Sequence, residues 1–365
     1  KLNLKNSPNY LKALLLNSPF PNSILDISTS FLSESLQRKV KGFQYERIGA
    51  DRGMLGEIFK LTIDTDTGIE FVIAKFSSQS KEAMDNAKRG GIHERELRCY
   101  DELLSQTPIS VPHIYASWLD AESSEYLILQ EFIDYDQSVD QIEGITISHA
   151  KLVIKEAAAM HAFWWGKDDL QKLGWLPALN DERRRTNLTT VTKLGWGALK
   201  QIIQNEGVAI QEISKNQLAE KVDSMLCSIA NNQSTLIHSD LRADNLLFSP
   251  KDPSVVIVDW QGCSYAPPAF DIAYLLVQSL TVRDRREHEL GLLQFFSECL
   301  ANEGLIISLD EILNIYKESI LYNLAIACAV PVVNDVDVPR VKDLAFSMAS
   351  RALTALDDHE ISLAP

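Results

Sequence analysis

Residues 236–261 read LIHSDLRADNLLFSPKDPSVVIVDWQ, and the interpretation of the whole chain depends on this stretch. Its short apolar runs, separated by polar residues, predict strand, loop, strand, turn and strand in succession. Asp240, Asn245 and Asp259 lie within it, five and fourteen residues apart. The apolar run 255–258 leads directly to Asp259 at a strand end. The stretch therefore predicts three polar side chains positioned by short buried strands.

This spacing indicates a loop for phosphoryl transfer. In such loops one carboxylate orients the attacking hydroxyl group, while an Asn and a second carboxylate hold Mg²⁺ on the phosphates of ATP. Mg²⁺ prefers hard oxygen ligands and needs only one or two protein carboxylates beside the phosphates. We therefore predict Asp240 as the catalytic residue, Asn245 and Asp259 as metal ligands, and ATP and Mg²⁺ as cofactors.

HSDLRADNLLF followed by VVIVDWQ resembles the aminoglycoside phosphotransferase and choline kinase superfamily, and within it the ecdysteroid kinase-like branch. That branch has HGDL, three residues, Asn, and then Asp, an aromatic residue and Gln. Here Ser239 replaces the usual Gly, and Trp260 and Gln261 stand where protein kinases have Phe and Gly. Alternatively, HSD and DN are only turn residues between buried strands, but that interpretation does not explain the full constellation.

The resemblance implies an α+β, two-lobed, protein-kinase-like fold. Residues 1–133 would form the N-lobe, with an N-terminal helical extension, a small antiparallel sheet over ATP and one key helix. Residues 134–365 would form a mostly helical C-lobe with the catalytic loop and the acceptor pocket. A chain of 365 residues with 45% apolar residues is large enough for both lobes.

Composition excludes several other classes of protein. The net charge of −15 argues against a nucleic-acid partner, which favours a basic face. Five cysteines without a CxxC pair provide no zinc or redox motif and indicate reduced thiols in the cytoplasm. No apolar run is long enough to span a bilayer, and the run 13–16 is too short for a signal peptide. The oligomeric state is not predicted.

Five strands are expected in the N-lobe, after short helices in residues 1–44. Residues 66–68 (Asp-Thr-Gly) predict a hairpin turn between the second and third strands. The expected strands cover residues 45–50, 56–64, 69–77, 111–121 and 126–133.

The connection between the first two strands, IGADRGMLGEIF, contains Gly49, Gly53 and Gly56. Glycine permits positive φ and close approach, so such a loop can bring backbone N–H groups near phosphates. We select Gly49 and Gly53 as candidate nucleotide contacts. The pattern is neither GxGxxG nor a Walker loop, and an ordinary flexible hairpin explains it equally well.

Lys75 lies in the apolar phrase VIAKF on the third expected strand. The resemblance implies that Lys75 contacts the phosphates of ATP and that a carboxylate holds its ammonium group. The family pattern of an acidic residue before an aromatic gives Glu96 as this partner, with Glu94 as the fallback. The alternative is that Lys75 points to solvent and that both acids lie on a solvated helix face.

The strand YLILQEFI would lead into a hinge whose main chain contacts adenine, by resemblance to the family. Its position gives Glu131, Phe132 and Ile133 as the hinge residues. A plain edge strand remains the alternative, because main-chain contacts place little constraint on side-chain identity.

Helices are expected after residue 134, the first with Ser148 as N-cap, two within 190–232, one near Ala269, and more within 283–357. The phrase MHAFWW resembles the family, and we interpret His161 as structural. By the same resemblance, His238 and Asp271 support the catalytic loop. The tryptophans are expected in the core or in a pocket wall; they are Trp164, Trp165, Trp175 and Trp196.

The predicted reaction is transfer of the γ-phosphoryl group of ATP to a hydroxyl group of a small molecule. A catalytically silent nucleotide-binding regulatory module and a protein Ser/Thr kinase are the alternatives. The second is disfavoured by the missing APE phrase and by Trp260 and Gln261. Residues 134–365 carry 20 basic and 32 acidic side chains, which favours a cationic acceptor. Resemblance to the ecdysteroid kinase-like branch favours an uncharged or weakly charged hydroxylated acceptor, which we rank first, with aminoglycosides second.

Overall fold

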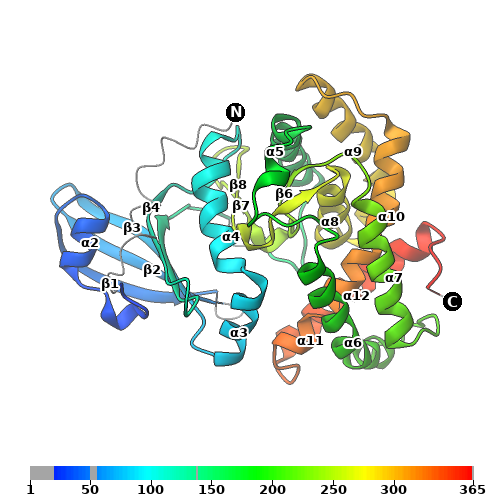
Figure 1. Cartoon of the computed structure of the whole chain (residues 1–365), viewed down its shortest axis with the longest axis horizontal. Helices are drawn as coiled ribbons and strands as arrows, with labels where there is room; N and C mark the ends of the chain where they lie inside the picture. Colours follow the sequence, from blue (N-terminus) through cyan, green and yellow to red (C-terminus); the bar gives the residue numbers. More distant parts are fainter. Residues whose placement is uncertain (1–19, 50–55, 137–138, 364–365) are drawn as a thin grey trace. The chain divides into compact units, whose positions relative to one another are not determined.

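The computed structural model describes residues 20–49, 56–136 and 139–363. The chain divides into two compact units, which we describe separately (Figure 1). Unit 1 comprises Lys1–Asp134 together with Val256–Gly262. Unit 2 comprises Tyr135–Val255 and Cys263–Pro365. The segment that carries Asp259 therefore packs with the N-terminal unit, although it is distant from it in sequence.

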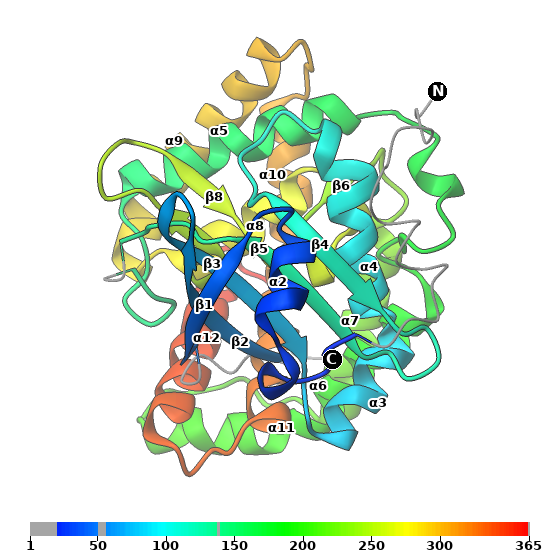
Figure 2. The same ribbon diagram turned by 90° about the vertical axis from the view of Figure 1, so that its left-hand side faces the viewer.

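Unit 1 is built on a five-stranded antiparallel sheet with the strand order β1-β2-β3-β5-β4 (Figure 2). Thr65 pairs with Gly68, so Asp66 and Thr67 form a two-residue hairpin turn where the sequence predicts one. The strands are β1 (Val40–Ile48), β2 (Gly56–Thr65), β3 (Gly68–Ser77), β4 (Ile114–Leu119) and β5 (Tyr126–Glu131).

The first strand begins at Val40, earlier than expected, so the prediction of helix up to residue 44 is wrong. Val40 is buried and Phe43 packs against the same apolar core, so this part of the strand contributes to the sheet interior. The helix before it is short, α2 (Thr29–Ser35), and Ser28 caps it by accepting a hydrogen bond from the Phe31 N–H.

The sheet has two different faces because side chains alternate along each strand. On one face Val72, Ala74 and Phe76 of β3 join a core with Leu32 of α2, which crosses the sheet in Figure 2. On the other face, Tyr126 and Ile128 of β5 pack against Leu97 of α4 (Ile92–Arg98). Since Lys75 alternates with Ala74 and Phe76, it lies on the α4 side.

The helical path that begins with α4 changes its geometry after Arg98. After α4 the chain makes a π turn (Cys99–Leu103) and then a 3-10 turn (Leu104–Gln106). The wider turn keeps Cys99, Tyr100 and Leu103 buried. Another helix, α3 (Lys81–Gly90), precedes α4, and Gly91 connects the two in the left-handed conformation.

Unit 2 is mostly helical. Its central helix is α8 (Ala269–Ser279), in which every residue is buried and which packs against α10 and α12. The other helices are α5 (Ile147–Trp164), α6 (Glu182–Asn205), α7 (Lys215–Ile229), α9 (Val282–Asn302), α10 (Leu309–Ala327), α11 (Val330–Val333) and α12 (Pro339–Asp358). Unit 2 also contains the short strand pair β6 (Thr235–Ile237) with β9 (Ser264–Ala266). The remaining strands are β7 (Leu246–Phe248) in unit 2 and β8 (Val255–Ile257), most of which belongs to unit 1.

The N-cap of α5 is Thr146, so the expected cap at Ser148 is wrong. The Thr146 hydroxyl oxygen accepts a hydrogen bond from the His149 N–H at 3.1 Å. Ser148 lies inside the helix, where its hydroxyl is 3.0 Å from that of Thr146. Thr146 and Ser148 are both residue types that cap helices. The helix that forms is the longer one, which begins directly after Thr146.

Close packing in unit 2 depends on one helical glycine. A Cβ atom on Gly195 of α6 would lie 1.8 Å from the Cys328 carbonyl oxygen, so only glycine fits there. Trp164 and Trp196 are buried in the core, whereas Trp165 and Trp175 are partly exposed. Among the described residues, no helix is both long and apolar enough to cross a membrane. None of the five cysteines, all of which lie in the described residues, forms a disulfide bond.

Candidate functional site

Asp259 follows β8 and adopts a conformation that is unusual for its residue type. Its φ of 66° lies in the left-handed region, which costs a non-glycine residue about 1–2 kcal/mol. The neighbouring Trp260 is fully buried, and its Nε1 donates a hydrogen bond to the Ile257 carbonyl oxygen at 3.2 Å. The buried indole therefore stabilises the turn that presents Asp259.

Lys75 is buried in unit 1 and does not point to solvent, with 7% of its surface exposed. Its Nζ donates to both carboxylate oxygens of Glu96, at 2.8 and 3.0 Å, and to Asp259 Oδ1 at 3.1 Å. Glu94 pairs instead with Arg98 on the outer face of α4. Burial alone would lower the pKa of Lys75, but the carboxylates of Asp259 and Glu96 raise it well above its ordinary value. The amine is therefore charged at any physiological pH.

The glycines of the first connection have different roles. Gly49 has a φ of 70° at the end of β1, which favours glycine. Gly53 lies outside the described residues. A Cβ atom on Gly56 would approach the Phe76 carbonyl oxygen to 2.4 Å, so Gly56 allows β2 to pack on β3.

The expected hinge residues lie at the end of β5 and directly after it. The Glu131 N–H donates to the His113 carbonyl oxygen at 2.8 Å, so the sheet edge already uses this group. The Phe132 ring lies 5.5 Å from that of Phe71, and Lys60 Nζ lies 4.7 Å from the Phe132 ring centroid. Phe132 and Ile133 remain the better candidates for main-chain contact with a base.

In unit 2, Asp271 anchors the loop that carries Asp240. Its two carboxylate oxygens accept hydrogen bonds from the backbone N–H groups of His238, at 2.7 Å, and Ser239, at 2.8 Å. Asp271 is fully buried, and His161 Nε2 lies 3.3 Å from Oδ2. Ser239 has a φ of 68°, and these bonds hold it in that left-handed conformation. His238 Nδ1 in turn accepts from the Asp240 N–H at 3.2 Å.

Asp271→Ala is expected to destabilise the protein by about 3 kcal/mol or more, because two buried N–H groups lose their charged acceptor. Urea unfolding would measure this loss. Asp284→Ala in the first turn of α9 is the matched control, because within the described chain that carboxylate bonds only to Thr281 at the helix N-terminus. An equal loss in the two variants would contradict a special role for Asp271.

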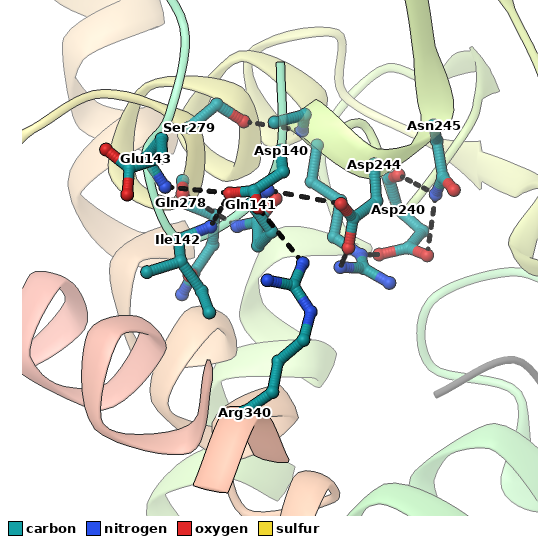
Figure 3. Close-up of polar contacts among 12 residues, drawn as sticks. Asp140, Gln141, Ile142, Glu143, Asp240, Asp244, Asn245, Gln278, Ser279 and Arg340 are labelled. Atoms are coloured by element: carbon teal, nitrogen blue, oxygen red, sulfur yellow. Dashed lines mark hydrogen bonds and ion pairs between the residues drawn. The ribbon is translucent and has the colours of Figure 1, made fainter. Parts of the chain in front are cut away.

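The Asp240 carboxylate is fixed at both oxygens (Figure 3). Arg242 Nε donates to Oδ1 at 3.1 Å, and Asn245 Nδ2 donates to Oδ2 at 2.9 Å. The same Nδ2 also donates to the Asp240 carbonyl oxygen at 2.8 Å. The Asp240 side chain is 33% exposed. The carboxylate is thus oriented rigidly and still open to a ligand.

The donor types fit a hard divalent cation. With its amide nitrogen bonded to Asp240, Asn245 presents its amide oxygen on the opposite side (Figure 3). Within the described ranges, no group of three or more His, Cys, Asp or Glu side chains could hold a metal ion alone. Mg²⁺ suits such a sparse ligand set, because it takes its remaining ligands from phosphate oxygens and water. The Asn245 amide oxygen and the Asp259 carboxylate are both ligand types that Mg²⁺ accepts.

A second layer of polar contacts supports the Asp240 loop. Arg242 Nη1 donates to Asp244 Oδ2 at 2.9 Å, and the Gln141 N–H donates to Asp244 Oδ1 at 3.1 Å. The Ala243 N–H donates to the Ser279 hydroxyl oxygen of α8 at 3.0 Å (Figure 3). The loop is therefore tied to α8 and to the turn that contains Gln141.

That turn is held by a buried arginine of α12. Arg351 donates to the carbonyl oxygens of Gln141, Ile142 and Gln278 at 2.6–2.8 Å. Burial lowers the pKa of Arg351 to about 10. Arg340, also on α12, pairs with Asp140 at 3.0 Å (Figure 3). A cation bonded to three carbonyl groups fixes the backbone beneath the loop.

The predicted site residues thus form two groups. Lys75, Glu96 and Asp259 meet in unit 1. Asp240 and Asn245 meet in unit 2, where His238 and Asp271 support them. Three residues of the stretch 236–261 make polar contacts that were not predicted, although their charged or amide side chains were visible in the sequence: Arg242, Asp244 and Gln261. Gln141 and Arg351 had no recognisable signal, because their role depends on packing.

Comparisons with known proteins place the chain in a family. The model of the ecdysteroid kinase-like family matches residues 52–309. Acyl-CoA dehydrogenase family member 11 of Gallus gallus is 26% identical over 187 residues, which are 50% of this chain and 22% of that protein. The chain thus matches only about a fifth of the length of that curated relative.

Two solved structures share the fold. A protein of Ralstonia eutropha assigned to the aminoglycoside phosphotransferases superposes with a TM-score of 0.54 and 16% identity, over 91% of this chain and 98% of that one. Ethanolamine kinase of Plasmodium vivax superposes with a TM-score of 0.54 and 14% identity, over 87% of this chain and 81% of that one. The predicted α+β kinase-like fold is therefore confirmed.

Proposed function

The chain belongs to the ecdysteroid kinase-like family, and from this premise we propose that it transfers the γ-phosphoryl group of ATP to a hydroxyl group of a small molecule. The observation that carries the proposal is the Lys75 ammonium between the carboxylates of Glu96 and Asp259. Burying the charges of Lys75 and Glu96 is costly, and such clusters concentrate at functional sites.

In this proposal Lys75 and Asp259 act on the nucleotide. The Lys75 ammonium contacts phosphate oxygens, and Glu96 keeps it in place. Asp259 and Asn245 would hold Mg²⁺, which when bound offsets the charge that develops on the phosphate oxygens. Asp259 presents a carboxylate for this purpose because its turn is fixed by the buried Trp260.

Asp240 acts on the acceptor. Its carboxylate orients the acceptor hydroxyl, whose oxygen forms a new bond to the γ-phosphorus while the bond from that phosphorus to the oxygen of ADP breaks. The hydroxyl proton passes to Asp240 and then to solvent. Arg242 and Asn245 hold the two carboxylate oxygens, so the acceptor meets a fixed geometry and no reorientation is needed.

A silent nucleotide-binding module is the rival function. It would need the Lys75 cluster, but it would not need a carboxylate fixed at both oxygens and left partly open. The Asp240 contacts therefore favour turnover over binding alone.

For the acceptor we propose an uncharged or weakly charged hydroxylated molecule, with aminoglycosides as the second candidate. The family supports this order. Burial of Trp164 and Trp196 in the core removes two of the four tryptophans from a possible pocket wall and leaves Trp165 and Trp175. The acidic composition of residues 134–365 supports the aminoglycosides.

Release of ADP with acceptor panels at equal concentration would test the proposal. We expect saturable turnover with hydroxylated apolar compounds and less with kanamycin-like compounds, and no turnover by Asp240→Asn with either panel. Faster turnover of the kanamycin-like compounds than of the hydroxylated apolar compounds would instead indicate a cationic acceptor. If no acceptor panel gave ADP release although Mg²⁺–ATP still bound, the result would favour the silent nucleotide-binding module.

A further inference from the structure

Gln261 lies in unit 1, and the proposed reaction gives this residue no role. Its side-chain Nε2 donates to Glu96 Oε2 at 3.1 Å and to the Tyr126 hydroxyl oxygen at 3.3 Å. Its carbonyl oxygen accepts from Arg95 Nη1 at 2.9 Å. Arg95 and Glu96 are adjacent on α4, so this helix contacts both the backbone and the side chain of Gln261.

The charges around Glu96 explain why an amide suits this position. Glu96 Oε2 already accepts from Lys75 Nζ at 3.0 Å, and Asp259 is a second carboxylate on the same ammonium. Two carboxylates and one ammonium leave the cluster with a net negative charge. A neutral donor satisfies Glu96 without adding charge, whereas a third carboxylate would repel the first two.

The contact with Tyr126 extends the arrangement into the sheet. Tyr126 is buried in β5, and its ring stacks on that of His93 with the ring centroids 4.0 Å apart. His93 Nδ1 is 2.7 Å from the Ser124 carbonyl oxygen and is itself buried. The amide of Gln261 therefore links the segment after Asp259 to two firmly packed elements, α4 and β5.

We infer that Gln261 is a positioning residue for the nucleotide side of the site: it locks Glu96, and through Glu96 the Lys75 ammonium, to the segment that presents Asp259. The inference rests on the proposed function. It implies that the Lys75–Glu96 pair stays assembled with the Asp259 segment without a separate activating event.

Calorimetry of Mg²⁺–ATP binding to the full chain would test this role with Gln261→Glu. At pH 7.5 we expect binding about tenfold weaker or worse, because a charge-assisted hydrogen bond becomes a repulsion. Near pH 6 we expect affinity to recover in part, since the introduced carboxyl group, once protonated, can donate to Glu96 as the amide does. Gln79→Glu is the matched control: among the described residues this exposed amide bonds only to the Asn22 carbonyl oxygen, and its variant should bind like the unchanged protein at both pH values.

A second variant, Gln261→Leu, separates the lost hydrogen bond from the added charge. It should weaken binding less than Gln261→Glu and show no recovery at low pH. Thermal melting at both pH values would establish that each variant is folded. Wild-type affinity in Gln261→Glu, or tighter binding that depends on Mg²⁺, would overturn the inference alone. Failure of the unchanged chain to bind Mg²⁺–ATP would overturn the proposed function and this inference together.

Discussion

Asp240→Asn is expected to lower kcat by about 10²–10⁴-fold, the range typical for loss of a positioned general base. The amide has nearly the same shape, so the contacts of the loop to Asp271 and Asn245 should persist. An amide cannot take the proton of the acceptor, and its NH₂ group would face Arg242 or Asn245. Affinity for Mg²⁺–ATP should remain within about twofold, because Lys75 and Asp259 carry that binding.

Single-turnover kinetics with the best acceptor, together with calorimetry of nucleotide binding, would check both halves of this expectation. Asp252→Asn on the exposed turn between β7 and β8 is the matched control and should change neither quantity. Loss of nucleotide affinity in Asp240→Asn with kcat retained would reverse the roles we assign to the two carboxylates.

Lys75→Met is expected to abolish nucleotide binding and also to destabilise the protein by about 3–5 kcal/mol, as for removal of one partner of a buried ion pair. From the sequence alone we expect folding to be unaffected. The burial of Glu96 changes that expectation, because the variant leaves this carboxylate uncompensated beside Asp259. Urea unfolding would measure the loss, with Lys81→Met on the exposed start of α3 as control.

The pH dependence of this variant has a definite sign. Burial raises the pKa of Glu96 above its ordinary value of 4.5, and removing Lys75 removes the group that opposes the rise. The folded variant then binds a proton that the unfolded chain has released, so its stability falls as pH rises from 4.5 through the raised pKa. The double variant Lys75→Met, Glu96→Gln should lose this pH dependence and regain stability. Equal pH profiles for the single and double variants would contradict the explanation.

The sequence was sufficient where local pattern decides the outcome. Apolar runs between turn residues predict the five strands of the sheet, and the turn at 66–68 depends on two residues and a glycine. Motif spacing selected Asp259 and resemblance to the family selected Glu96, and the structure brings both to Lys75. These features involve short runs whose chemistry is visible in the residues themselves.

The remaining features depend on tertiary packing. Both Thr146 and Ser148 can cap a helix, and nothing local selects between them. Gly56 resembles a phosphate-loop glycine, but its role is to clear the Phe76 carbonyl group on the next strand. The partner of Asp271 could not be read from the sequence, because its acceptor role requires backbone N–H groups from a distant loop.

The contact of Arg351 with the backbone at Gln141 has a consequence for biosynthesis. These residues are 210 positions apart, and the Asp240 loop also waits for Asp271 and Ser279 of α8. A ribosome adds only about 5–20 residues per second, so the nascent chain must carry an unfinished loop until α12 emerges from the exit tunnel. During that interval the carbonyl groups that Arg351 later binds are open to water, to chaperones and to proteases. Maturation of the Asp240 loop therefore waits for a helix that is synthesised much later than the loop itself.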